Sequence, residues 1–173
     1  MKLKIHYLAL LLAFFSMLVL GSCDSNDEPP MRTEEDILGI WRNDNRYMDV
    51  QSDYRAYNLL VEQQNGTSIG RWSLDGFFYE PGYKLVVYMG EDLDPTVYAI
   101  VELTETTLIW CPVDSLKEEY DAGESIGQII GEVIKRAQNG YKVNPELYEY
   151  FEKISAEEYF RMLEELNIFY PWD

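Results

Sequence analysis

The sequence predicts an α+β fold that is mainly β, with helices at its C-terminal end. Residues 39–113 hold short runs rich in Tyr, Val, Ile, Thr and Trp, separated by turn signals, which is typical of antiparallel strands. Beyond Ser125 the apolar residues recur at intervals of three and four, which is typical of amphipathic helices. We expect one domain over residues 37–173, with a β part (37–113) and a helical part (114–173).

The β part begins at Gly39-Ile40-Trp41 and is divided by glycine-containing turns. Asn65-Gly66 is the strongest hairpin signal, because a type I′ turn needs two residues at positive φ. Asp75-Gly76 and Pro81-Gly82 indicate further turns. About six strands result, starting at 39 and continuing over 54–63, 67–74, 83–89, 96–103 and 106–111. Because each is joined locally to the next, they predict an antiparallel meander or a partly open barrel of about six to eight strands.

The helical part should contain two or three helices packed on the strands. Ile126 to Ala137 carries an apolar stripe and stops at Asn139-Gly140. Asn144-Pro145 resembles a helix start and predicts a short helix through Leu147, Phe151 and Ile154. A capping box at 155–158 then predicts a last helix. We expect the final aromatic residues, Phe169, Tyr170 and Trp172, to dock on the domain.

The N-terminus resembles that of a bacterial lipoprotein. An apolar run over 8–20 is too short to span a bilayer, which takes about 20 residues, but it suits a signal peptide (1–22). Leu20-Gly21-Ser22-Cys23 resembles the lipobox, which implies that Cys23 carries acyl chains such as palmitate and anchors the protein to a membrane. The alternative is an ordinary secreted protein. Residues 23–36 should form an acidic flexible tether.

The acidic run directly after Cys23 bears on localisation. Residues 24–28 resemble the export signal of surface-exposed lipoproteins in certain Gram-negative bacteria. This resemblance implies a cell-envelope protein of the outer membrane, exposed at the cell surface. Two alternatives stay open: a merely solvated linker, or inner-membrane retention, which an Asp after the cysteine favours in some bacterial groups.

Composition excludes several classes of function. Removal of residues 1–22 takes away two of the 14 basic residues and none of the 31 acidic ones, which leaves a formal charge of −19. Such a charge repels nucleic acids and anionic lipids. The single histidine, His6, also leaves with the signal, so histidine-based catalysis and histidine metal sites are excluded. Cys111 is then the only free thiol, and we expect it to be buried. We therefore expect no enzyme activity, no cofactor and no metal.

The β part resembles the lipocalin-like lipoproteins of Gram-negative bacteria. Leu38-Gly39-Ile40-Trp41 matches the Gly-x-Trp start of lipocalins. The ranges 70–76, 84–87 and 98–108 also follow the pattern of these lipoproteins. The resemblance covers about residues 37–112 and implies a barrel in which Trp41 packs across the bottom. With six strands, the helices would cover the gap or the mouth of an open barrel.

Aromatic residues at alternate strand positions are candidates for a ligand pocket. They are Trp41, Tyr57, Trp72, Tyr88, Tyr98 and Trp110. The alternative is that they simply fill the core. We expect the inward positions to be apolar or aromatic, because buried carboxylates without partners are costly. Arg71 or a Tyr hydroxyl would orient the ligand.

The sequence also contains two short motifs that resemble known sites. The acidic loop 91–94 is expected to be solvated rather than to hold calcium, because it lacks the glycine and the distal glutamate of an EF-hand loop. Asp114-Ser115-Leu116 resembles a bacterial O-glycosylation motif, which makes Ser115 a candidate site.

The predicted function is that of a non-catalytic lipoprotein with a lipocalin-like domain. It would bind a small apolar or glycan-derived ligand at the outer membrane or the cell surface. The alternative is an accessory protein–protein interaction module of an envelope assembly. An enzyme that works with Asp, Glu and Tyr alone is a third and weaker hypothesis.

Overall fold

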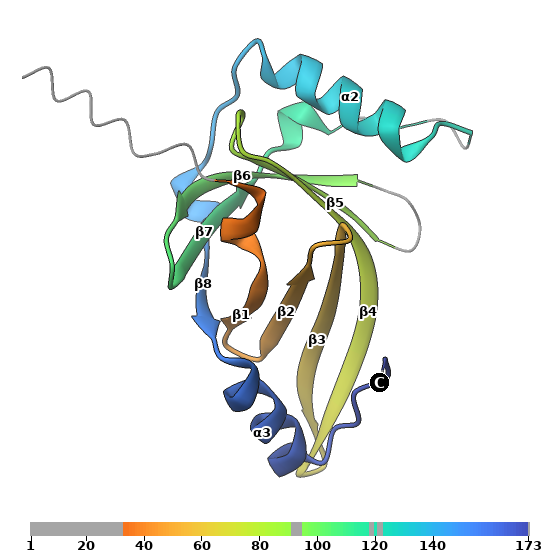
Figure 1. The fold of residues 1–173 in the computed structure, drawn as a ribbon, viewed down its shortest axis with the longest axis vertical. Helices are drawn as coiled ribbons and strands as arrows, with labels where there is room; N and C mark the ends of the chain where they lie inside the picture. The colour runs from red at the N-terminus through yellow and green to blue at the C-terminus, as the bar shows by residue number, and fades with distance from the viewer. Residues whose placement is uncertain (1–32, 91–94, 118–119, 121–122, 173) are drawn as a thin grey trace, which may run out of the picture. The chain divides into compact units, whose positions relative to one another are not determined.

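Eight antiparallel strands form a closed barrel in the computed structural model, which describes residues 33–90, 95–117, 120 and 123–172. Each strand is hydrogen-bonded to the next along the chain, and the last pairs with the first (Figure 1). The strands are β1 (Gly39–Asn43), β2 (Arg46–Gln51), β3 (Arg55–Gln64), β4 (Thr67–Glu80), β5 (Leu85–Met89), β6 (Pro95–Leu103), β7 (Thr107–Pro112) and β8 (Glu149–Ile154). The mainly β class and the antiparallel barrel are confirmed. Cys23, the signal peptide, most of the tether and the loop 91–94 lie outside the described residues.

The barrel closes through a strand that the sequence pattern did not predict. A helix was expected through Phe151 and Ile154, but the helical conformation ends after one 3-10 turn, η3 (Pro145–Leu147). The following residues form β8, which pairs with both β1 and β7. This double pairing satisfies the backbone groups of two strands that would otherwise be open edges. The prediction of a helix through residues 147–154 is therefore wrong.

The predicted strands needed two further corrections. β2 was not predicted, and it follows β1 through a two-residue turn in which Asp44 has a φ of 50°. Asp75-Gly76 was expected to form a turn, but β4 continues through both residues to Glu80. Gly76 pairs with Arg55 of β3 and also with Met89 of β5. The long strand β4 therefore passes from one neighbour to the other at this point.

In the part of the chain that the structure describes, two α-helices pack on the outside of the barrel, as expected (Figure 1). Helix α2 (Ile126–Ala137) begins at a capping box formed by Ser125 and Gln128, and its apolar stripe packs on β5, β6 and the end of β7. Helix α3 (Ala156–Leu166) is capped by Ser155, whose Oγ accepts a hydrogen bond from the Glu158 amide at 3.1 Å. It packs on β1 and β3. Among the described residues, no helix has both the length and the apolar character needed to cross a bilayer.

One end of the barrel holds the buried side chain of Trp41. The 3-10 helix η1 (Glu34–Ile37) precedes β1, and the Trp41 Nε1 donates to the Ile37 carbonyl at 2.7 Å. Trp41 is completely buried in the interior core. The Lys153 Nζ lies 5.0 Å from the centre of its ring, and the Lys153 stem crosses Gly39, where a Cβ would lie 2.8 Å from it. The residues of the Gly-x-Trp start therefore pack tightly together at this end.

Candidate ligand pocket

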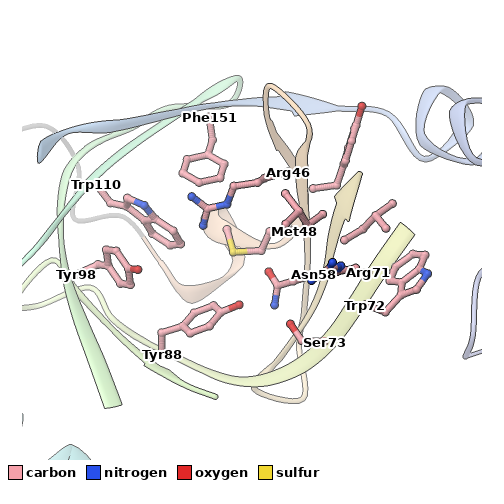
Figure 2. A pocket seen from close by; sticks show the side chains of 13 residues that line it. Arg46, Met48, Asn58, Arg71, Trp72, Ser73, Tyr88, Tyr98, Trp110 and Phe151 are labelled. Atoms are coloured by element: carbon pink, nitrogen blue, oxygen red, sulfur yellow. The ribbon is translucent and has the colours of Figure 1, made fainter. Parts of the chain in front are cut away.

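A cavity of about 350 Å³ lies inside the barrel, toward the end opposite η1. This volume is at the lower end of the range for small-molecule sites, about 300–1,000 Å³. Figure 2 shows its side chains in two groups, with Arg46 and Met48 of β2 between them. Aromatic rings form one wall, and short polar side chains lie opposite.

The aromatic wall consists of rings that contact one another. Tyr98 and Trp110 are stacked, with ring centres 4.4 Å apart. Phe151 meets Trp110 edge-to-face at 5.0 Å, and Tyr88 meets Tyr98 at 6.3 Å. Such pairs hold one another in place and present a rigid surface for an apolar or flat group.

The polar wall is organised by one carboxylate. Asp75 is only 6% exposed, and its Oδ2 accepts three hydrogen bonds. The donors are the Tyr88 hydroxyl at 2.5 Å, the Asn58 amide at 2.7 Å and the Ser73 hydroxyl at 3.0 Å. These three partners come from β5, β3 and β4, so the carboxylate ties together three adjacent strands. A buried carboxylate requires such donors, because without them its desolvation is costly.

A second charged group lies nearer the mouth. The Arg46 guanidinium contacts Glu149 at 3.1 Å and lies 5.9 Å from the centre of the Phe151 ring. The same Glu149 oxygen accepts a hydrogen bond from the Trp110 indole at 3.1 Å. Arg46 is half exposed, so part of its guanidinium faces the open end of the cavity.

The tyrosines of the cavity keep their protons near neutral pH. Burial raises the pKa of the Tyr88 hydroxyl far above its ordinary value, and the hydrogen bond to Asp75 raises it further. Burial also raises the pKa of Tyr98, with a smaller contribution from the negative charge of Glu149. Both hydroxyls are therefore neutral groups that can bind a ligand, and neither is activated as a nucleophile or a base.

Four of the six predicted pocket residues line the cavity: Trp72, Tyr88, Tyr98 and Trp110. Trp41 belongs to the interior core near η1 and does not line the cavity. Trp72 borders the cavity, but its ring contacts Tyr170 and Trp172 outside the barrel, at 5.2 and 5.3 Å.

Tyr57 lies on the outer face of the barrel. It pairs with Leu74 of β4, and its ring centre is 4.6 Å from that of Trp172. It therefore belongs with Trp72 and Tyr170 to an outer aromatic cluster rather than to the pocket. The same contacts show that the C-terminal aromatics Tyr170 and Trp172 pack on the domain, whereas Phe169 is 78% exposed.

The expectation that the inward positions would be apolar or aromatic needs correction. Asp75 and Glu149 do not line the cavity themselves, but each contacts residues that do. Each is compensated, Asp75 by three neutral donors and Glu149 by Arg46 and the Trp110 indole. Arg71, the expected orienting group, lines the mouth, but it is 69% exposed and pairs with Glu62 at 3.0 Å. Four lining residues were not predicted from the sequence: Arg46, Asn58, Ser73 and Phe151. Alternation along β3 and β4 could have found Asn58 and Ser73, which are directly paired.

The remaining candidate residues lie outside the cavity. Ser115 is exposed on η2 (Asp114–Leu116), and its glycosylation stays a prediction. Cys111 is fully buried, as expected, with its Sγ 3.3 Å from the Asn144 carbonyl oxygen. In the described ranges, no group of three or more His, Cys, Asp or Glu residues is arranged to hold a metal ion.

No family model, no curated protein and no solved structure matches this chain.

Proposed function

We propose that the protein is a non-catalytic lipocalin-like lipoprotein whose barrel binds a small apolar or glycan-derived ligand. The observation that carries this proposal is the cavity, in which a rigid aromatic wall faces a fixed polar wall. Ligand sites typically combine predominantly apolar surfaces with a few precisely placed polar groups.

The arrangement of the polar groups favours binding over catalysis. The oxygen of Asp75 that faces Tyr88, Asn58 and Ser73 is occupied by their three hydrogen bonds, and the tyrosines stay protonated. A general base needs a free acceptor at the reacting proton. The cavity therefore supports recognition of a ligand more directly than its conversion.

Binding is tested by titration of the domain with four ligand classes. Fatty acids, bile acids, tetrapyrroles and oligosaccharides are each followed by tryptophan fluorescence and calorimetry. Trp110 reports directly, since it lies in the cavity wall. Tyr98→Ala should weaken a bound ligand about tenfold, because it removes a stacking surface. Tyr150→Ala is the matched control, since this tyrosine is 59% exposed on β8. Flat titrations with all four classes would overturn the proposal.

We further propose that the lipid on Cys23 attaches the domain to the outer membrane, facing the cell surface. Support comes from the lipobox and from the acidic run that follows it. Two acyl chains or more are needed for a stable anchor. Mass spectrometry of the N-terminal peptide should find acylated Cys23, and Cys23→Ala should release the protein from membranes. Protease added to intact cells should remove the domain, and full protection would contradict surface exposure.

A second candidate function, a protein–protein interaction module, is favoured by the C-terminal surface. Phe160 of α3 is 43% exposed and Phe169 is 78% exposed, and both border a shallow groove that Leu163 and Ile168 help to form. Exposed apolar groups gathered in this way are typical of interaction sites. Cross-linking on intact cells should capture a partner that Phe169→Ser loses. If Tyr98→Ala loses the partner instead, the groove is not its site.

A further inference from the structure

We infer that the cavity selects a neutral ligand that donates hydrogen bonds from hydroxyl groups, a saccharide-like ring rather than a fatty acid. This inference rests on the proposed ligand-binding function and specifies the chemistry of that same site. It follows from the hydrogen bonds that the polar side chains of the wall donate to Asp75.

All three donors near Asp75 point at one oxygen. The Tyr88 hydroxyl, the Ser73 hydroxyl and the Asn58 amide each donate to Oδ2. A tyrosine or serine hydroxyl has one proton, so each has given its only donor to the carboxylate. The Asn58 amide uses its nitrogen a second time, on the Ala56 carbonyl oxygen at 3.2 Å. The donors of this wall are therefore committed within the protein.

What these groups still offer a ligand is acceptor capacity. The hydroxyl oxygens of Tyr88 and Ser73 retain lone pairs, and the Asn58 Oδ1 accepts no hydrogen bond from the residues that the structure describes. All three residues line the cavity (Figure 2). Acceptors on adjacent strands β3, β4 and β5 match a ligand edge that carries several hydroxyl groups. These three side chains offer the carboxylate of a fatty acid no free donor.

The charges of the site point to a neutral ligand. Arg46 and Arg71 are paired with Glu149 and Glu62, which balances each cation. Asp75 then remains as a carboxylate served only by neutral donors. An anionic group placed against Asn58, Ser73 and Tyr88 would lie near the buried charge behind them, and repulsion is strong in a low-dielectric interior.

The aromatic wall suits the other side of such a ligand. The C–H face of a pyranose ring is apolar and packs on aromatic rings, while its hydroxyls lie around the edge. Tyr98 and Trp110 supply the apolar surface opposite the acceptors of Asn58 and Ser73 (Figure 2). The cavity thus has an apolar surface on one side and acceptors on the other. This arrangement matches a ring with one apolar face and a hydroxylated edge.

The test compares sugars with their O-methylated forms, which keep the acceptor oxygens and lose every hydroxyl donor. Cellobiose, maltose and their permethylated derivatives are titrated calorimetrically into the full domain, beside palmitate. We expect the free sugars to bind at least about tenfold more tightly than the methylated forms, since each lost hydrogen bond costs several-fold in affinity.

Two variants locate the effect on the polar wall. Asp75→Asn replaces an acceptor by a group that also donates, so Tyr88 and Ser73 can turn their protons toward the ligand. The preference for free over methylated sugar should then shrink or reverse. Ser73→Ala leaves the carboxylate in place with two donors and should weaken the free sugars several-fold while leaving the methylated forms unchanged. Circular dichroism checks that both variants fold.

The outcomes separate the two proposals. Equal binding of free and methylated sugars, or binding of palmitate alone, would overturn the donor inference and leave the ligand-binding function intact. Failure of every sugar together with every other ligand class would overturn both. Selective binding of the free sugars that Ser73→Ala does not weaken would also contradict the inference, because the polar wall would then not be the cause.

Discussion

Two aspartates of the same barrel, Asp75 and Asp49, are buried to nearly the same extent but receive different numbers of hydrogen bonds. Asp75 faces the interior and is 6% exposed, whereas Asp49 lies on the outer face of β2 and is 8% exposed. Asp75 accepts three hydrogen bonds from three strands. Asp49 accepts one, from the Gln51 amide at 2.6 Å.

The difference shows that only Asp75 receives hydrogen bonds from several strands. Burial raises the pKa of Asp49, and the single hydrogen bond from Gln51 only partly opposes this. Nearby, the Tyr159 hydroxyl of α3 is buried without a hydrogen-bond partner in the part of the chain that the structure describes. The outer face thus carries polar groups at a cost to stability. The inner face gives one oxygen of its carboxylate three donors, which is expected where a site must be preorganised.

Removal of Asp75 should have the largest effect. Asp75→Ala leaves the donors of Tyr88, Ser73 and Asn58 without their acceptor, and orphaned buried donors are costly. We expect the free energy of unfolding to fall by about 3 kcal/mol, measured by denaturant titration. Asp53→Ala is the matched control, because this aspartate is 55% exposed and its pairing with Arg55 should contribute little. Equal effects of the two changes would contradict the role of Asp75.

Removal of one donor should have an intermediate effect. Tyr88→Phe takes away the shortest hydrogen bond to Asp75 and should lower the free energy of unfolding by about 1–2 kcal/mol. Combined with Asp75→Ala it should cost less than the sum of the two single changes, because one orphaned donor is gone. Strict additivity in this double-mutant cycle would mean that the two groups do not stabilise one another. Tyr150→Phe, at an exposed position, should be neutral.

The sequence predicted the parts of the fold that local signals determine. Asn65 and Gly66 both have positive φ and join β3 to β4, as their turn chemistry requires. The periodic helix α2 begins directly after Ser125. β8 could not be predicted in this way, because Leu147, Phe151 and Ile154 also fit a helical period after an Asn-Pro start. Pairing with β1 and β7 decides its conformation, and that pairing is not visible in a local pattern.

The candidate site was predicted on its aromatic side and missed on its polar side. Tyr88, Tyr98 and Trp110 follow from alternation along strands that were correctly placed. The sequence pattern predicts a turn at Asp75, because Gly follows it. A turn residue is not expected in the barrel interior, so Asp75 was not a candidate for the site. Only the register of β4, in which Asp75 pairs with Ala56 and Ser73 with Asn58, brings the polar wall together.

Neutralising Asp49 should stabilise the protein at neutral pH, in contrast to any change at Asp75. The folded pKa of Asp49 is raised, so its contribution to stability is full below the ordinary pKa of an aspartate, about 3.9, and is lost as pH rises through the folded value. Asp49→Asn should therefore raise the melting temperature at pH 7, and the gain should shrink as the pH falls.

Asp53→Asn removes the same charge from an exposed position, so it controls for the high net charge. A destabilised Asp49→Asn at pH 7 would mean that the carboxylate is better compensated than its single hydrogen bond indicates.

The smallest expected change comes from the buried hydroxyl of Tyr159 on the outer face. Tyr159 is completely buried between α3 and the barrel, where its ring packs 5.7 Å from that of Tyr47. Burial is the main cause that raises the pKa of its hydroxyl, and the neighbouring charge of Asp49 adds to it, so the group stays neutral at any ordinary pH. Tyr159→Phe keeps the ring and removes only the hydroxyl, which has no partner to lose. It should therefore raise the free energy of unfolding by about 1 kcal/mol.

Tyr54→Phe, at a position 55% exposed, should leave stability unchanged. Loss of stability in Tyr159→Phe would mean that the hydroxyl is hydrogen-bonded in solution, and the outer face would then resemble the inner one more closely than the two aspartates indicate.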